Sequence, residues 1–164
     1  MRIGEIRERD IGNGPGIRTV LFVTGCRFNC KGCFNKKLQD FNYGEPFSEK
    51  HIDQLEKALK SPYIQGLTIL GGEPMEHPEV LTDLTRESRR RGALEGKDIW
   101  IYSGYTYESL LRSNIQFRLL LEADVLVDGL FVQALYDPNL KYRGSSNQRV
   151  INLKDTNKSQ NITI

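Results

Sequence analysis

Apolar residues follow two periods along the chain, and the two periods alternate. Short runs of β-branched and aliphatic residues predict buried strands, whereas apolar residues three or four positions apart predict helices. The runs predict strands at 17–24, 67–70, 98–102 and 125–127. Helical spacing predicts helices between Ser48 and Pro62 and between Pro78 and Gly92, and short helical segments between 106 and 120. This alternation implies an α/β fold, with parallel strands joined by right-handed crossovers.

The two ends of the chain lack this pattern. Residues 1–16 are polar and, toward Gly16, rich in glycine, which predicts an N-terminal loop. Residues 152–164 consist largely of Lys, Asp, Asn, Ser and Gln, which predicts a flexible tail. A length of 164 residues suits one domain with a sizeable core, so we expect a single domain over 1–164.

The composition is typical of a soluble globular protein. Charged residues make up 27% of the chain, yet the formal net charge is only +2, so we expect no nucleic-acid partner and no membrane partner. No apolar run reaches the length of a membrane span. The thiols are clustered and the chain starts without a signal-peptide pattern, so we expect a cytoplasmic protein in reducing surroundings.

All three cysteines lie in one short stretch, Cys26-x3-Cys30-x2-Cys33. A structural zinc site normally has four ligands, so zinc would also need His51 or His77, and neither lies in this loop. A disulfide framework needs an even number of cysteines. Inert buried thiols would not explain why the cysteines cluster in a polar loop. A [4Fe-4S] cluster with three thiolate-bound irons, and one iron open to a substrate or cofactor, fits the count best.

A second group of candidate residues, Gly71-Gly72-Glu73-Pro74, follows the predicted strand 67–70. Two glycines at a strand end permit positive φ angles and let a ligand approach the backbone closely. The carboxylate of Glu73 offers an acceptor for an ammonium group. The alternative interpretation of the tetrapeptide is a tight turn without a ligand.

The cysteines, this tetrapeptide, Ser103 and Asp128 all follow the carboxyl ends of predicted strands. In parallel α/β barrels that face carries the site. A complete eight-stranded barrel needs roughly 250 residues. The present chain is shorter, so it predicts a partial, open (β/α) barrel, which can admit a large substrate from the side.

The cysteine loop, followed by Gly71-Gly72-Glu73-Pro74, resembles the radical S-adenosylmethionine (SAM) superfamily. Within it, further runs resemble the family of proteins that activate anaerobic ribonucleoside-triphosphate reductase: Gly12 to Arg18, Gly32 to Asn35, Lys97 to Trp100, Val127 to Gly129 and Arg143 to Gln148. The match extends over about residues 5 to 150. It implies a partial, open barrel of the radical SAM type.

One position departs from the superfamily pattern. Many members carry an aromatic residue just before the third cysteine, where this chain has Gly32, and its aromatic residue is Phe34. Activating proteins of this family commonly show the same arrangement, so the departure points to this family within the superfamily. It leaves open which side chain stacks near the adenine of SAM.

The resemblance implies that the three cysteines hold three irons of a [4Fe-4S] cluster and that the methionyl amine and carboxylate of SAM bind the fourth. It implies that one electron cleaves SAM to methionine and a 5′-deoxyadenosyl radical. That radical removes a hydrogen atom from a glycine Cα of the reductase and leaves a glycyl radical. The protein's part is to position and shield the reactive species, because the hard chemistry belongs to the cofactor.

The resemblance also assigns roles to individual residues. The metal ligands are Cys26, Cys30 and Cys33. Other residues are expected to bind SAM: Gly71, Gly72 and Glu73 at the methionyl amine, and Gly32, Cys33 and Phe34 near the adenine. Ser103 and Asp128 are candidates for contacts to the ribose, the carboxylate or a cation, and hydrogen bonding within their own loops is the alternative.

The implied partners are the large subunit of the anaerobic reductase and an electron donor such as flavodoxin. Candidate assemblies are a homodimer and a heterotetramer with the reductase. Two other functions stay open at this stage. One is a radical SAM enzyme that acts on another glycyl-radical enzyme or on a small molecule, and the other is a non-catalytic cysteine-rich metal-binding module. From composition alone, residues 142–149 suit a partner or ligand surface as well as a solvated loop.

Overall fold

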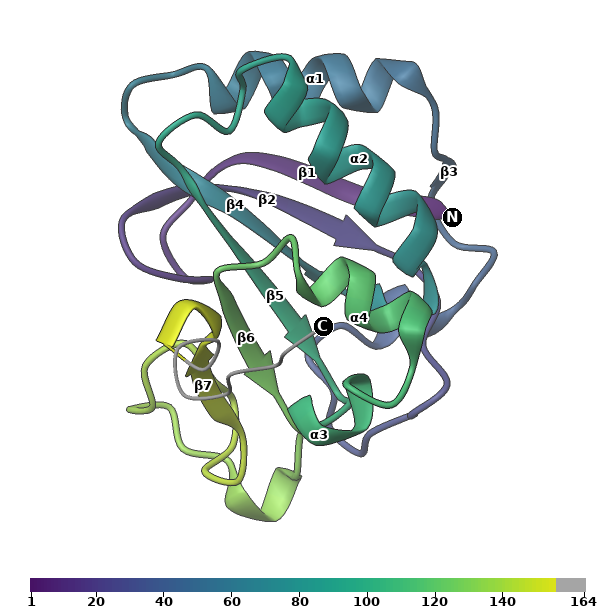
Figure 1. Ribbon diagram of the computed structural model, residues 1–164. Helices are drawn as coiled ribbons and strands as arrows, with labels where there is room; N and C mark the ends of the chain where they lie inside the picture. Colours follow the sequence, from purple (N-terminus) through teal and green to yellow (C-terminus); the bar gives the residue numbers. More distant parts are fainter. Residues whose placement is uncertain (156–164) are drawn as a thin grey trace.

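A mixed β-sheet forms the centre of the computed structural model, which describes residues 1–155 (Figure 1). Within these residues the sheet has seven strands in the order β3-β1-β2-β4-β5-β6-β7. Their bounds are Arg2–Asp10 (β1), Ile17–Val23 (β2), Glu45–Pro46 (β3), Ile64–Gly71 (β4), Asp98–Ser103 (β5), Val125–Asp128 (β6) and Arg149–Asn152 (β7).

The four strands predicted from the sequence are the central ones, and they pair in parallel as β2-β4-β5-β6. Helices separate them along the chain: α1 (Glu49–Leu59), α2 (Pro78–Arg90), α3 (Tyr107–Leu110) and α4 (Asn114–Leu120). None of the helices in this part of the chain has the length and apolar character needed to cross a bilayer. Closure of the sheet into a partial barrel of the radical SAM type stays a prediction.

The two faces of the sheet differ in what covers them. Figure 1 shows α1, α2 and α4 on the same side of the sheet. Because side chains alternate along a strand, Leu21 and Ile69 point into the core beneath these helices, whereas Phe22 and Leu70 belong to a small separate cluster. That cluster lies on the face without helices, where it lines a cavity.

The predicted loop over residues 1–16 is wrong for its first part, because residues 2–10 form β1. This strand pairs antiparallel with β2 on one side and with β3 on the other. Its buried apolar side chain is Ile3, and most of its other side chains are polar and partly or fully exposed. The strand is held by backbone hydrogen bonds rather than by an apolar pattern, so only residues 11–16 form the expected loop.

The predicted tail from residue 152 onward begins too early. Asn152 belongs to β7, which pairs antiparallel with β6. Leu153 is 5% exposed and packs in the core, and its amide donates a hydrogen bond to the Asp124 carbonyl at 2.9 Å. The rest of the predicted tail, residues 156–164, lies outside the described residues.

A buried arginine ties the 11–16 loop to the sheet. Arg18 on β2 is 0% exposed. Its Nε donates to Thr68 Oγ1 at 2.7 Å, and its Nη1 lies 2.8 Å from Asp98 Oδ1. Thr68 in turn donates its hydroxyl to the Asn13 carbonyl at 2.8 Å. This chain of contacts places the loop beside the cavity, which Asn13 helps to line.

Replacing Arg18 by Ala should destabilise the fold by about 2–4 kcal/mol, because it leaves buried partners without their donor or counterion. Urea denaturation of the protein, monitored by circular dichroism, measures the change. Arg9→Ala is the matched control, since Arg9 is exposed on β1, and it should change stability by no more than about 0.5 kcal/mol. Equal stabilities for the two variants would contradict this structural role.

Candidate functional site

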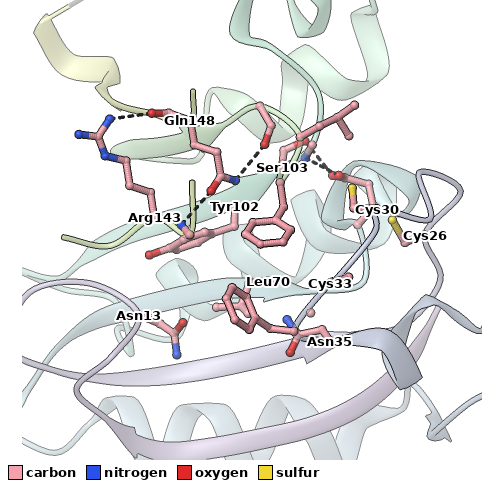
Figure 2. A pocket seen from close by; sticks show the side chains of 18 of the residues that line it. Asn13, Cys26, Cys30, Cys33, Asn35, Leu70, Tyr102, Ser103, Arg143 and Gln148 are labelled. Atoms are coloured by element: carbon pink, nitrogen blue, oxygen red, sulfur yellow. Dashed lines mark hydrogen bonds between the residues drawn. The ribbon is translucent and has the colours of Figure 1, made fainter. Parts of the chain in front are cut away.

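A cavity of about 550 Å³ lies on the helix-free face of the sheet. Its walls include the carboxyl ends of the parallel strands and the segment 129–148, which follows β6. Figure 2 shows Cys26 and Cys30 on the right-hand side of the cavity and Arg143 and Gln148 on the left. All three cysteines line it. The structure therefore brings the predicted metal ligands to the wall of one open cavity.

The cysteine loop begins directly after β2. Gly25 has a φ of +92° and turns the chain away from the strand, and the Gly25 amide donates to the Leu38 carbonyl at 2.8 Å. The three cysteines are half-buried and form no disulfide. Burial raises the pKa of Cys26 and Cys30, and hydrogen bonds from backbone amides oppose the shift. Amide donors of this kind stabilise thiolate, which is the form that binds metal.

Among the described residues, the metal-binding side chains that line the cavity include three thiols and no histidine. Among residues 1–155 no three His, Cys, Asp or Glu side chains converge where one metal ion could sit. Zinc requires such convergence, whereas each thiolate of a [4Fe-4S] cluster binds a different iron. Both histidines are engaged elsewhere: His51 Nδ1 accepts from the Ser48 amide at 3.1 Å, and His77 Nε2 lies 2.7 Å from the Thr24 carbonyl oxygen. An all-sulfur donor set around one cavity suits iron and sulfide.

The Gly71–Gly72 turn packs against the start of the cysteine loop. Gly71 has a φ of +118°, and the Gly72 amide donates to the Val23 carbonyl at 2.8 Å. A Cβ on Gly72 would lie 2.5 Å from the Gly25 carbonyl oxygen and 2.7 Å from that of Leu38. No side chain fits there, because both neighbours are backbone atoms. The close approach at Gly72 is that of a neighbouring loop, and the approach of a ligand to these glycines stays a prediction.

Glu73 carries a buried carboxylate at the wall of the cavity. The residue is 1% exposed. Its Oε1 accepts hydrogen bonds from Ser103 Oγ at 2.8 Å and the Met75 amide at 2.9 Å, and its Oε2 accepts from the Gly104 amide at 2.7 Å. Burial raises the pKa of Glu73 to about 7, against the opposing effect of these donors. The structure holds no cation beside it, so a positively charged ligand would find a preoriented partner.

Ser103 and Asp128 have different surroundings. Ser103 lines the cavity, and its hydroxyl orients Glu73. Asp128 is 1% exposed and is not among the residues that line the cavity. Its Oδ1 accepts from Arg149 Nε at 2.9 Å, and its Oδ2 accepts from the Tyr107 amide at 2.7 Å. The expected cofactor contact of Asp128 is therefore not supported, because β7 brings Arg149 opposite this carboxylate.

Of the residues expected near adenine, Cys33 and Phe34 line the cavity, whereas Gly32 is exposed and is not among the lining residues. Gly32 has a φ of +72°, and a Cβ there would meet the Gln133 side chain at 2.9 Å. Phe34 is 68% exposed. Its ring centroid lies 5.1 Å from that of Phe131 and 5.7 Å from that of Tyr136. We call Phe34, Phe131 and Tyr136 the aromatic rim; all three line the cavity.

The sequence analysis missed several cavity residues. Tyr102 lines the cavity, and its buried hydroxyl has no hydrogen-bond partner among the described residues. Burial raises the pKa of this phenol. Strand alternation could have identified Tyr102, because its side chain points to the same face of the sheet as those of Phe22 and Leu70 on the neighbouring strands. Phe28, whose ring lies 4.7 Å from that of Tyr105, gave no such signal.

The polar run from Arg143 to Gln148 forms part of the cavity wall. Gln148 Oε1 accepts from the Gly144 and Ser145 amides at 2.9 and 3.2 Å, and its Nε2 donates to the Gly129 carbonyl at 2.9 Å. Arg143 Nη1 donates to the Gln148 carbonyl at 2.7 Å. These contacts make the segment an ordered wall rather than a solvated loop.

Replacing Gly72 by Ala should prevent normal cluster assembly, because the added methyl group would push the cysteine loop away from the end of β4. We expect iron and sulfide content after anaerobic reconstitution to fall several-fold. Gly96→Ala is the control, since at Gly96 (φ +67°) alanine adds backbone strain away from the cysteine loop while its Cβ meets nothing within 4 Å. Normal iron and sulfide content in Gly72→Ala would show that the close approach is dispensable.

Comparison with known proteins places the chain in a family. A family described as "4Fe-4S single cluster domain" matches residues 12–151, which include the three cysteines. Proteins named "Anaerobic ribonucleoside-triphosphate reductase-activating protein" are 44% identical in Escherichia coli (strain K12), 42% in Salmonella typhi and 37% in Enterobacteria phage T4. These alignments cover 88%, 94% and 92% of this chain and 94%, 100% and 93% of the relatives. The chain therefore belongs to the family of anaerobic ribonucleoside-triphosphate reductase-activating proteins, which confirms the resemblance seen in its sequence.

Proposed function

We propose that this protein activates an anaerobic ribonucleoside-triphosphate reductase as a radical SAM enzyme. Cys26, Cys30 and Cys33 would hold a [4Fe-4S] cluster, and SAM would bind its fourth iron. The observation that carries the proposal is that the three thiols and the buried carboxylate of Glu73 line the same cavity. The family to which the chain belongs supports the cluster and the target.

When bound, the cluster and SAM supply the 5′-deoxyadenosyl radical that takes a hydrogen atom from a glycine Cα of the reductase. The chain's own residues would bind and orient SAM. Glu73 would accept hydrogen bonds from the methionyl ammonium, and an adjacent cation would lower the pKa of this carboxyl from about 7 and favour the charged form. Ser103 and the Gly104 amide keep the carboxylate oxygens in place.

The rest of the cavity would shield the radical from water. Its floor includes Phe22 and Leu70 from neighbouring parallel strands, which offer apolar contact to an adenosyl group. The segment 129–148 forms the opposite wall. We propose that these surfaces belong to a partial, open barrel of the radical SAM type.

The edge of the cavity suits a protein substrate. On the aromatic rim, Phe34 is 68% exposed and Tyr136 is 50% exposed. Leu130 and Leu135 beside them are 40% and 43% exposed. Apolar side chains gathered at the mouth of a cavity are typical of a protein contact. We assign this surface to the glycine-bearing part of the reductase, and we assign electron donation to a protein such as flavodoxin in the cytoplasm.

The decisive experiment combines the reduced protein, SAM and the anaerobic reductase. Electron paramagnetic resonance should show a glycyl-radical doublet on the reductase, together with 5′-deoxyadenosine and methionine in equal amounts. Efficient SAM cleavage without a doublet would indicate a different target. An absence of cleavage by protein that carries its full iron and sulfide would refute the proposal.

Replacing Cys30 by Ala should abolish cluster assembly and SAM cleavage and leave most of the fold intact, because the core lies on the other face of the sheet. Iron and sulfide analysis and circular dichroism measure the two effects. Ser109→Ala, at a half-buried position of α3 where the hydroxyl donates to the Thr106 carbonyl, is the control and should retain both. If the protein were a zinc-stabilised module, Cys30→Ala would instead unfold it.

A further inference from the structure

The cysteine loop is strongly cationic. Residues 26–39 contain four cationic side chains and no acidic one: Arg27, Lys31, Lys36 and Lys37. The chain has 23 Lys and Arg against 21 Asp and Glu, so without these four the remaining residues carry 19 cations against the same 21 acids. The loop itself therefore carries a charge of +4 and the rest of the chain a charge of –2.

The cysteines of the loop line the cavity, whereas its cations are exposed and are not among the lining residues. Cys26, Cys30 and Cys33 are half-buried and line the cavity, whereas Arg27 and Lys31, which lie between them, are exposed. Lys36 and Lys37, at the start of the following short 3₁₀ helix η1 (Lys36–Gln39), are exposed as well. The cationic surface is thus the outer side of the same loop whose inner side would hold the cluster.

Most of this charge is not neutralised locally. Arg27 pairs with Glu76 at 2.5 Å and lies over the Phe41 ring, with its Cζ 5.4 Å from the centroid. Lys36 donates to the neutral side chain of Asn29. Within residues 1–155, the three lysines of the loop form no ion pair at 4.0 Å or less. The next acidic residue in the sequence, Asp40, caps the Asn42 amide at 2.8 Å.

We infer that the outer side of the cysteine loop, marked by Lys31, Lys36 and Lys37, is the docking surface for an acidic one-electron donor protein. The inference rests on the proposed function, which requires one electron for each SAM cleaved. The donor is oxidised by one electron and the cluster is reduced by one, and no bond or proton changes at that step. The loop is the element that separates the thiols from solvent, so a donor seated on it comes closest to the cluster.

Charge is suited to this task because the encounter has to be fast and reversible. Complementary charge steers partners together and raises association rates by about 10–10³-fold, an effect that salt suppresses. Individual exposed ion pairs add little affinity. A lysine surface without local acidic partners therefore favours a transient acidic partner over a permanent subunit.

The test uses the reconstituted holoprotein and a flavodoxin as the acidic donor. Lys31→Glu/Lys37→Glu should weaken flavodoxin binding about tenfold or more at low ionic strength, and should flatten the salt dependence that the unmodified protein shows. Binding is measured by titration with oxidised flavodoxin, which requires no turnover. SAM cleavage driven by reduced flavodoxin should fall in parallel, while cleavage driven by dithionite should be unchanged.

The matched control is Lys57→Glu/Lys60→Glu, which makes the same charge change at two exposed positions, Lys57 on α1 and Lys60 at its C-cap. It should bind flavodoxin as the unmodified protein does. Equal binding by the two double variants would overturn the docking surface. So would loss of dithionite-driven cleavage in Lys31→Glu/Lys37→Glu with full iron content, because the lysines would then act on the cluster itself. Failure of the unmodified protein to cleave SAM with dithionite would instead refute the proposed function.

Discussion

The site depends on the close approach of two loops at the ends of β2 and β4. The Gly72 amide bonds to the Val23 carbonyl and the Glu73 amide to the Gly25 carbonyl, each at 2.8 Å. Any Cβ on Gly72 would overlap the Gly25 backbone, so these hydrogen bonds are compatible only with glycine. The parallel pairing of β2 with β4 aligns Val23 with Gly71 and sets this register. These backbone contacts consequently hold the cysteine loop and the Gly71–Glu73 turn beside one cavity.

Two buried carboxylates at the ends of parallel strands differ in their hydrogen-bond partners. Glu73 and Asp128 are both 1% exposed. Asp128 is paired with Arg149, with its Oδ2 2.5 Å from the guanidinium, and this pair joins β6 to β7. Glu73 receives only neutral donors, and its pKa rises to about 7 as a result of burial. A buried carboxylate without a cation is costly unless it is compensated, so Glu73 is the candidate partner for the positively charged ligand of the proposed function.

Local patterns made part of this arrangement predictable. The central strands, the cysteine loop and the Gly71–Glu73 turn each depend on neighbouring residues, and all were located from the sequence. β1 and β7 were missed because they are held by backbone pairing and carry few apolar side chains. The role of Asp128 was missed for a related reason. Its partner Arg149 is 21 residues away and reaches it only through the register of β7, which no spacing in the sequence reveals.

The cations of the cysteine loop could act on the thiols or on a partner protein, and their exposure to solvent distinguishes the two explanations. The first explanation is that the lysines assist metal binding, because positive charge near thiolates lowers the pKa of the thiols and stabilises an anionic centre. Such an effect is strong when the charges are buried together, yet Lys31, Lys36 and Lys37 are exposed to water and its ions. No resolved shift in the pKa of Cys26 or Cys30 has a cation among its main causes; burial dominates both. The lysines therefore have little effect on the thiols. Their electrostatic field still extends into the solvent over about a Debye length, where it would act on an approaching protein.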